Sequence, residues 1–233
     1  MIDWLPDLAA AVLAAVLAIT LHEAAHGYAA LAEGDATARE AGRLSLNPLR
    51  HVDPVGTLLL PGFLVISQLL TIGRVEVLFG WARPVPVDIR RMRDPRWGMV
   101  RVAAAGPAVN FVLAIAAGLV AHPLGWLAPM LPFVAVAWLT QFLGLLILSN
   151  LILGLFNLLP IPPLDGGRIL VGLLPARAAM ALARIERFGL LLVIFALIIL
   201  PRLPGGLDPI GWALRHVVGA ALRAVLTITG HGG

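Results

Sequence analysis

The sequence of 233 residues contains no cysteine, no lysine and few charged residues of any kind. The absence of cysteine excludes disulfide bonds and cysteine-ligated metal sites. Charged residues make up 13% of the chain and hydrophobic residues 60%, whereas soluble domains have roughly 25% charged and 45–50% apolar residues. Together with a mean hydropathy of +0.93, this composition is that of a membrane protein.

All 17 basic residues are arginine. The net charge of +4 and the pI of 11.1 would also suit a nucleic-acid-binding protein. The arginines, however, cluster between hydrophobic runs, where loops that border an anionic bilayer carry them. We therefore expect the lipid bilayer, and no nucleic acid, as a partner. Arginine use without lysine indicates a GC-rich prokaryote, so the expected location is a prokaryotic inner membrane, as a multi-pass protein.

The hydrophobic runs set the expected fold. A spanning helix needs about 20 predominantly apolar residues. We expect such segments at 8–33, 54–73, 102–121, 133–160 and 188–200. A further helical pattern at 209–229 carries arginine and histidine, and the sequence leaves open whether it spans the membrane. The predicted fold class is an all-α polytopic membrane protein with about five to six transmembrane or re-entrant helices.

The expected organisation is a single membrane-embedded domain over residues 1–233, with a core over 8–175 and C-terminal helices over 176–229. No Arg or Lys precedes the first run, which argues for a retained helix rather than a secretory signal. The positive-inside rule places the arginine-rich loops in the cytoplasm and the N-terminus outside. Segment 54–82 must then begin and end on the inner side, as a re-entrant segment or a helical hairpin, consistent with a break at Pro61 and Gly62.

The stretch "EVLFGWARPVPV" at 76–87 combines β-branched residues, aromatics and prolines, which is typical of extended chain. We expect it to form a small membrane-associated β element, and a plain connector is the alternative. Such an element could pair with an unwound peptide as an added strand.

The first hydrophobic run contains the stretch "TLHEAAHGY" at 20–28. On a helix, His22 and His26 lie on one face, one turn apart, with Glu23 beside them. This is the H-E-x-x-H arrangement of two zinc ligands and a general base. Ionisable groups inside a membrane span are costly and therefore functional candidates. The alternative is a pair of packing histidines with Glu23 as their hydrogen-bond partner.

A catalytic zinc needs three protein ligands and one open position. Because cysteine is absent, the third ligand must be His, Asp or Glu. Asp165 lies at the inner end of the 133–160 segment, at the depth expected for His26, although Asp-Gly-Gly is also an ordinary turn or cap signal. His51 is expected to be solvated, His122 and His216 to lie near membrane boundaries, and His231 to lie in a disordered tail.

Three ordered motifs then give a specific resemblance: "HEAAH" at 22–26, "GPAVN" at 106–110 and "NLLPIPPLDGG" at 157–167. "GRLSLNPLRHVDPVGTLLLP" and "FGWARPVPV" add to it. The sequence resembles the site-2 protease family of intramembrane zinc metalloproteases, in its short prokaryotic form without a PDZ or CBS domain. The similarity covers roughly residues 16–175.

The resemblance implies that His22, His26 and Asp165 bind one Zn²⁺ per chain, and that Glu23 is the base that activates its water. It also implies membrane-embedded substrate helices, often of membrane-tethered regulators or anti-sigma factors. Asn110 and Asn157 match family asparagines that orient substrate or stabilise the oxyanion. The alternative is that each of them joins helix to helix.

Two other functions use similar residues. A zinc transporter or sensor also needs intramembrane His and Asp, but transporters often have repeated halves, and none is visible in the sequence. A catalytically inactive relative that binds membrane helices would be expected to lack Glu23 or a ligand. The sequence therefore favours a zinc endopeptidase whose site faces the cytoplasmic side, and it leaves the oligomeric state open.

Overall fold

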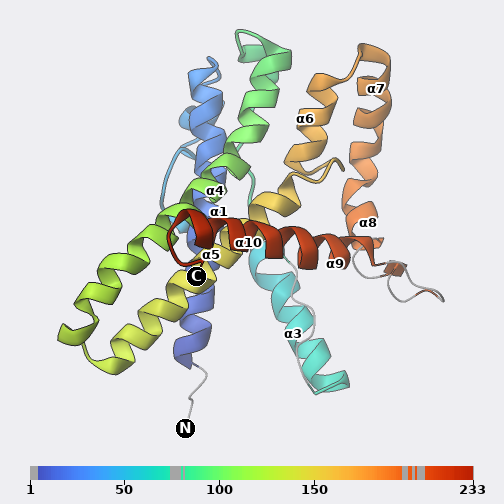
Figure 1. Ribbon diagram of the computed structural model, residues 1–233. Coiled ribbons are helices and arrows are strands. Elements are labelled where there is room, and N and C mark those ends of the chain that lie inside the picture. Colours follow the sequence, from blue (N-terminus) through green and yellow to red (C-terminus); the bar gives the residue numbers. More distant parts are fainter. Residues whose placement is uncertain are drawn as a thin grey trace.

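The computed structural model describes residues 5–73, 80, 82–195, 199–200, 203 and 208–232, and these are helical or irregular without any strand (Figure 1). The principal helices are α1 (Leu5–Ala32), α3 (Leu60–Thr71), α4 (Pro95–Leu127), α5 (Phe133–Asn157), α6 (Asp165–Leu173), α7 (Ala176–Ile185), α8 (Gly189–Ile194), α9 (Pro209–Ala213) and α10 (Gly219–Ile228). The all-helical fold that composition and hydropathy predict is confirmed for this part of the chain.

Within the described residues, four helical segments are long and apolar enough to cross a membrane: Leu5–Ala32, Pro54–Thr71, Pro95–Met130 and Phe133–Asn157. These correspond to the predicted segments 8–33, 54–73, 102–121 and 133–160. The third segment is longer than predicted at both ends, because α4 begins at the side-chain cap of Asp94 and continues through Pro107 and Pro123. The chain is therefore a multi-pass membrane protein.

Helices α1, α4 and α5 form the core of the molecule (Figure 1). Small residues make this close packing possible, because bilayer helices approach one another through Gly and Ala. Ala10, Ala14 and Ala18 form a fully buried stripe along α1, and Ala114 of α4 is equally buried. The larger apolar side chains of α1 are instead about half exposed, as expected for residues that face lipid: Leu8, Val12, Leu13 and Leu17.

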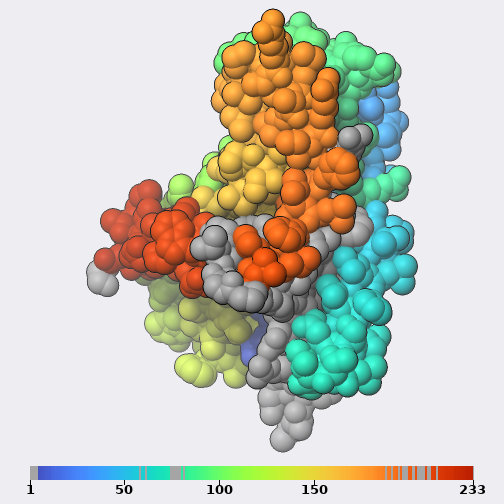
Figure 2. Space-filling view, turned by 90° about the vertical axis from the view of Figure 1, so that its right-hand side faces the viewer, coloured from blue at the N-terminus to red at the C-terminus, as the bar shows by residue number. Residues whose placement is uncertain are grey.

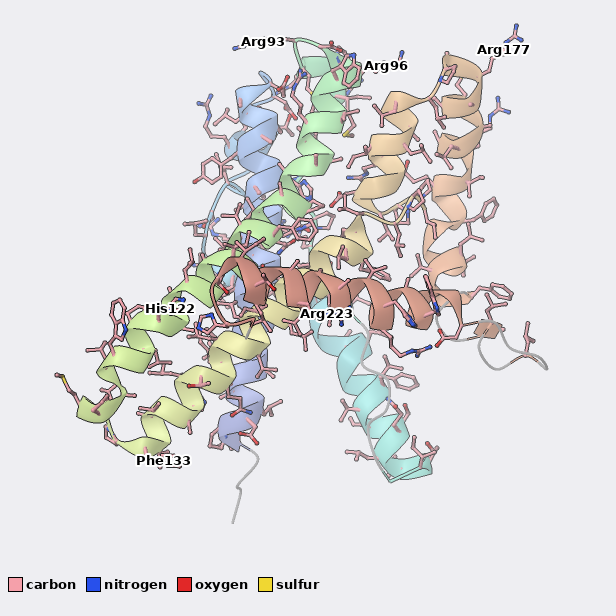
Figure 3. All side chains as sticks on the ribbon, in the orientation of Figure 1. Arg93, Arg96, His122, Phe133, Arg177 and Arg223 are labelled. Carbon is pink, nitrogen blue, oxygen red and sulfur yellow. The ribbon has the colours of Figure 1, made fainter. Side chains whose placement is uncertain are left out.

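The charges are distributed unequally along this bundle. Arg93 and Arg96, at the start of α4, lie at the same end of the molecule as Arg177 of α7, whereas Phe133 lies at the opposite end (Figure 3). At the arginine-rich end, Arg101 makes a bidentate ion pair with Glu33, with N–O distances of 2.6 and 2.7 Å. This pair joins the end of α1 to the first turns of α4.

The segment that contains α3 leaves the bundle and returns to it. The amide of Arg83 donates to the carbonyl of His51 over 2.8 Å, so the two flanks of the segment meet, as the re-entrant prediction requires. The predicted break at Pro61 and Gly62 is wrong. The helix changes from π geometry in η2 (Pro54–Leu59) to α geometry at Leu60, so Pro61 occupies a first-turn position, where its missing N–H costs nothing.

The C-terminal helices lie across the bundle. In two views related by a 90° turn, α6 and α7 occupy one end, α3 extends toward the other, and α10 crosses at middle height (Figures 1 and 2). Val218 and Val225 pack in the core cluster with Ala114 and Leu143. The helical pattern of 209–229 is thus confirmed, and the segment packs crosswise on α4 and α5. Of the helix predicted at 188–200, residues 196–198 lie outside the described residues.

The β element predicted at 76–87 is not observed. Residues 76–79 and 81 lie outside the described residues, and 82–88 have no regular secondary structure. The latter segment, which we call the strap (residues 82–88), is held by side chains rather than by a sheet. Its Asp88 amide donates to Asp35 over 2.7 Å, and its Val85 amide donates to Glu23 over 2.9 Å.

Candidate metal centre and its surroundings

The structure brings His22, His26 and Asp165 together at one point. His22 Nε2 lies 3.0 Å from His26 Nε2 and 3.2 Å from Asp165 Oδ2, and His26 Nε2 lies 3.3 Å from the same oxygen. All three side chains are largely buried. They form a compact group of potential metal ligands, as H-E-x-x-H spacing and the predicted depth of Asp165 both indicate.

The two histidines come from one turn of α1, and Asp165 is the first residue of α6. Helix α6 is anchored from the other side by Arg96, whose guanidinium donates to the carbonyls of Gly172 (2.6 Å) and Leu174 (3.0 Å) at its C-terminal end. A cation at this end also complements the helix dipole. This anchor fixes α6 against α4 and so presents Asp165 to α1.

Hydrogen bonds define the tautomer of both imidazoles. His22 Nδ1 lies 2.6 Å from Asn110 Oδ1, and His26 Nδ1 lies 2.7 Å from the carbonyl oxygen of Val102. Each partner is an acceptor, so each Nδ1 carries the proton and each Nε2 presents a lone pair. Two lone pairs 3.0 Å apart in a buried site repel each other unless a cation lies between them.

The carboxylate of Asp165 is also arranged as a ligand. Its Oδ2 lies 3.2 and 3.3 Å from the Nε2 atoms of His22 and His26, which offer it no proton in these tautomers. This oxygen is buried and has no hydrogen-bond donor within the described part of the chain. A buried anionic oxygen without a donor is costly, and a metal ion would remove that cost.

These three atoms fit zinc. A tetrahedral zinc with bonds of about 2.0–2.2 Å separates its ligand atoms by roughly 3.3–3.5 Å, close to the observed 3.0, 3.2 and 3.3 Å. Two neutral imidazoles and one carboxylate form a catalytic ligand set that leaves a fourth position open. The donor set and its spacing therefore match a catalytic zinc.

Glycine makes room for the imidazoles on α4. A Cβ at Gly106 would lie 2.5 Å from His26 Nε2 and 2.6 Å from His22 Cε1, distances that no side chain tolerates. Gly166 and Gly167 allow the close approach that positions Asp165, because a Cβ at either would collide with the backbone of the turn that precedes α6. The glycines of "GPAVN" and "LDGG" thus allow three backbones to converge on one site.

Asn110 is completely buried, and its amide makes three hydrogen bonds. Its Oδ1 accepts from His22, while its Nδ2 donates to Asn150 Oδ1 (2.8 Å) and to the carbonyl of Ala18 (3.3 Å). No solvent-facing group remains on this side chain. Asn110 therefore holds His22 and joins α1 to α4 and α5 in this arrangement.

Asn150 is the residue that sequence reasoning missed. It is completely buried in α5, and its Nδ2 donates to the carbonyl of Leu146 over 2.8 Å. Because that carbonyl only accepts, Asn150 Oδ1 must face Asn110, and Asn110 Oδ1 must then face His22. A polar residue in an apolar span is a signal of function, but only the packing of α5 on α4 shows which group it serves.

Glu23 lies beside the centre and under the strap. Its Oε2 accepts from the Val85 amide, and its Oε1 makes no hydrogen bond within the described part of the chain. Asn157, the last residue of α5, is half-buried, and its Nδ2 donates to the carbonyl of Leu153 over 3.0 Å. Asn157 therefore stands outside the hydrogen-bond network of the histidines.

The remaining histidines lie elsewhere. His51 is buried and bonds to the Ser45 carbonyl over 2.8 Å, so the prediction that it is solvated is wrong. His122 lies within α4 and bonds to the carbonyl of Thr229 over 2.6 Å. His231 packs on His122 with ring centroids 4.3 Å apart, rather than lying in a disordered tail. His216, the fourth, bonds to the carbonyl of Trp212 over 2.8 Å, and none of the four belongs to the ligand group of the metal centre.

Comparison with known proteins agrees with this chemistry. Peptidase family M50 matches residues 120–200, which contain α5 and the turn that leads to Asp165. The chain is 40% identical over 209 residues to "Putative zinc metalloprotease YwhC" of Bacillus subtilis, covering 85% of this chain and 88% of that relative. No solved structure matches the chain.

Two longer relatives match in part. The chain is 33% identical over 192 residues to "Putative zinc metalloprotease Rip2" of Mycolicibacterium smegmatis, covering 78% of this chain and 64% of the relative. It is 38% identical over 113 residues to "Putative zinc metalloprotease Rip3" of Mycobacterium tuberculosis, covering 46% of this chain and 27% of the relative. Given the nearly full-length match to YwhC, this chain belongs to peptidase family M50, the site-2 protease family of zinc metalloproteases.

Proposed function

We propose that this chain is an intramembrane zinc metalloprotease that hydrolyses peptide bonds within or near transmembrane helices of other membrane proteins. The observation that carries the proposal is the position of the ligand group. His22 and His26 lie on a helix long and apolar enough to span a bilayer, and they meet Asp165 in a buried site. A substrate that reaches this site must approach from within or beside the membrane.

In this proposal His22, His26 and Asp165 hold zinc. The zinc ion, when bound, would lower the pKa of a water molecule toward about 7 and polarise the carbonyl of the scissile peptide. Glu23 takes the proton of the attacking water and transfers it to the leaving amine nitrogen. The unbonded Oε1 of Glu23 is the atom available for this transfer, while Oε2 is held by Val85.

The strap offers a surface for an unwound substrate. The amides of Arg83 and Val85 already donate to His51 and Glu23, and Pro84 and Pro86 have no N–H. Because the carbonyl of Arg83 already accepts from Arg43, residues 84–86 present the carbonyl acceptors, without free donors. We propose that the N–H groups of a substrate strand donate to these carbonyls, in the manner of strand addition, and that Asn157 contacts the same peptide.

Several further assignments belong to this proposal. The arginine-rich end seen in Figure 3 is assigned to the cytoplasm by the positive-inside rule. His26 lies in the last third of α1, whose end pairs with Arg101 through Glu33, and this places the metal centre toward that end. The described helices act together as one membrane-embedded domain. Membrane-tethered regulators, including anti-sigma factors, are the expected class of substrate.

The test has two stages. The full chain is purified in detergent and its zinc content is measured beside His22→Ala, Asp165→Ala and Glu23→Gln variants that remain folded. The same proteins are then reconstituted with a reporter whose transmembrane helix carries fluorescent groups on both sides of the bilayer. We expect one zinc per chain and reporter cleavage in the wild type, no zinc in the two ligand variants, and zinc without cleavage in Glu23→Gln. A zinc-loaded wild type that cleaves soluble peptides but not the membrane reporter would refute the intramembrane assignment.

A further inference from the structure

A second concave site, separate from the metal centre, lies between the strap and the loop that follows α2 (Thr37–Glu40). The cavity has a volume of about 390 Å³ and is lined by Ala41, Arg43, Leu49, Arg50, Val52, Arg83, Pro84 and Pro86. Three of its eight lining residues are arginine, and none is acidic. A cavity whose charged lining residues are all cations is unusual on a chain with so few charged residues.

Arg43 forms the base of this cavity. Only 8% of the residue is exposed. Its Nη2 donates to the carbonyl of Arg83 over 2.7 Å, but its Nε is buried and has no partner among the described residues. A guanidinium presents its donors as a fixed planar fork, and the fork of Arg43, which lines the cavity, is only partly satisfied by the described residues.

Arg50 and Arg83 form the exposed rim. Arg50 Nη1 has only a long contact of 3.4 Å with the carbonyl of Gly42. Among the described residues, no carboxylate lies within ion-pair distance of any of the three guanidiniums. By contrast, Arg90, Arg91 and Arg101 are each paired with an acid.

The electrostatic environment of Arg43 favours an anion bound in the cavity. Burial and then the nearby charge of Arg83 lower its pKa, with a smaller contribution of the same sign from Arg50, while Glu23 is the one charge that raises it. A buried cation that faces two other cations is destabilised unless an anion compensates it. An anion in the cavity would contact all three groups.

The shape and the surroundings indicate which anion. Phosphate oxygens match the guanidinium fork in bidentate geometry. The same loop exposes Leu49, which lines the cavity and is 77% exposed, and Leu46, which is 60% exposed. Val55 and Leu59, at the start of the neighbouring membrane segment, are also exposed. Apolar residues beside a cationic cavity at a membrane boundary suit a phospholipid better than a soluble ion.

We propose that Arg43, Arg50 and Arg83 form a binding site for a phosphate group, supplied by the headgroup of an anionic phospholipid. Arg43 and Arg83 bind the phosphate oxygens from the base and the rim, and Leu46 and Leu49 lie against the glycerol and the acyl chains. Because Arg83, Pro84 and Pro86 belong to the strap, the bound lipid also holds the segment whose Val85 amide binds Glu23.

The test measures binding and needs no proteolysis. The full chain is placed in nanodiscs of phosphatidylcholine with a minority of phosphatidylglycerol, and native mass spectrometry counts the phosphatidylglycerol molecules retained per chain. Arg43→Gln and Arg83→Gln are compared with wild type. Arg177→Gln is the matched control, because it removes the same charge from an exposed site on α7 at the arginine-rich end. In parallel, inorganic phosphate is titrated into the lipid-free detergent complex.

We expect wild type and Arg177→Gln to retain phosphatidylglycerol equally, and Arg43→Gln and Arg83→Gln to bind it about tenfold more weakly, as expected for loss of a charge-assisted hydrogen bond. Arg83→Gln keeps the carbonyl that anchors Arg43, so it remains informative if Arg43→Gln does not fold. Inorganic phosphate that binds with the same dependence on Arg43 and displaces the lipid would assign the site to free phosphate. Equal retention by all four proteins, or equal loss in Arg177→Gln, would overturn the proposal.

Discussion

Asn150 on α5 accepts a hydrogen bond of 2.8 Å from Asn110 on α4, and neither side chain reaches solvent. The pair forms the middle of a directed chain that begins at the Leu146 carbonyl and ends at His22 Nδ1. Each amide in it has one possible orientation. The packing of α5 on α4 therefore controls the tautomer, and hence the free lone pair, of a proposed zinc ligand on α1.

Replacement of Asn150 by leucine tests this chain. The variant removes the acceptor for Asn110 and frees that amide to rotate, so the Nδ1–H of His22 loses its fixed partner. Loss of such supporting hydrogen bonds typically weakens metal binding by about 10–100-fold. We expect the zinc affinity of the variant to fall by an amount near the lower end of this range, measured by titration of the zinc-loaded protein with a competing chelator. Asn157→Leu is the control, because Asn157 bonds only to the helix carbonyl of Leu153 in the described structure. Unchanged zinc affinity in Asn150→Leu would contradict the role assigned to it.

Substitution of Gly106 by alanine should empty the metal centre while leaving the fold intact. The new Cβ would stand 2.5 Å from His26 Nε2 and displace both imidazoles. We expect zinc content to fall well below one per chain, measured by elemental analysis.

The matched control is Gly125→Ala on the same helix, where a Cβ meets nothing within 4 Å. It should retain full zinc and gain up to about 1 kcal/mol, since alanine is the better helix former. If Gly106→Ala binds zinc as well as Gly125→Ala does, the imidazoles do not occupy the observed positions.

The contrast between His22 and His51 shows how far the sequence can predict this site. His22, Glu23 and His26 follow from local helical periodicity, which depends on five adjacent residues. Asp165 follows from topology, because charge distribution indicates which ends of the spans share a side. The burial of His51 depends instead on how the strap returns to pair with it, and no local pattern contains that information.

The strap illustrates a second limit of prediction from the sequence. The composition of 76–87 favours extended chain, but whether its amides pair with a strand or with side chains depends on what lies next to it. Here Glu23, within α1, and Asp35, just after α1, accept those hydrogen bonds. Asn150 was missed for the same reason, because the partner of a polar residue is decided by the rotation of one helix against another.

Asp35 gives a prediction with a pH dependence. It is completely buried and accepts from the amides of Thr37 (2.9 Å) and Asp88 (2.7 Å). Burial raises its pKa, but the hydrogen bonds from Thr37 and from the Asp88 amide outweigh burial and leave the pKa lowered from 3.8. A lowered folded-state pKa means that this stabilisation is present above about pH 4 and is lost as the pH falls through the folded value.

We therefore expect Asp35→Asn to reduce the free energy of unfolding by about 1.5–3 kcal/mol at pH 7, the range for hydrogen bonds to a charged group. The difference between the variant and wild type should shrink as the pH falls below 4, measured by thermal unfolding in detergent. Asp53→Asn is a control, because Asp53 accepts local amide bonds outside the strap. A difference that persists undiminished at low pH would show that the carboxylate charge is not what stabilises the strap.

Glu23→Gln separates metal binding from catalysis. Glutamine has nearly the same size as glutamate, and its Oε1 can still accept the hydrogen bond from Val85, so the strap and the zinc site should remain as they are. What the variant loses is a group that takes up a proton, and loss of a general base typically reduces the rate by about 10²–10⁴-fold. We expect unchanged zinc content, an unchanged unfolding temperature and reporter cleavage reduced by that factor. Cleavage at the wild-type rate in this variant would assign the proton transfer to another group, and loss of zinc would mean that Glu23 supports the metal rather than the water.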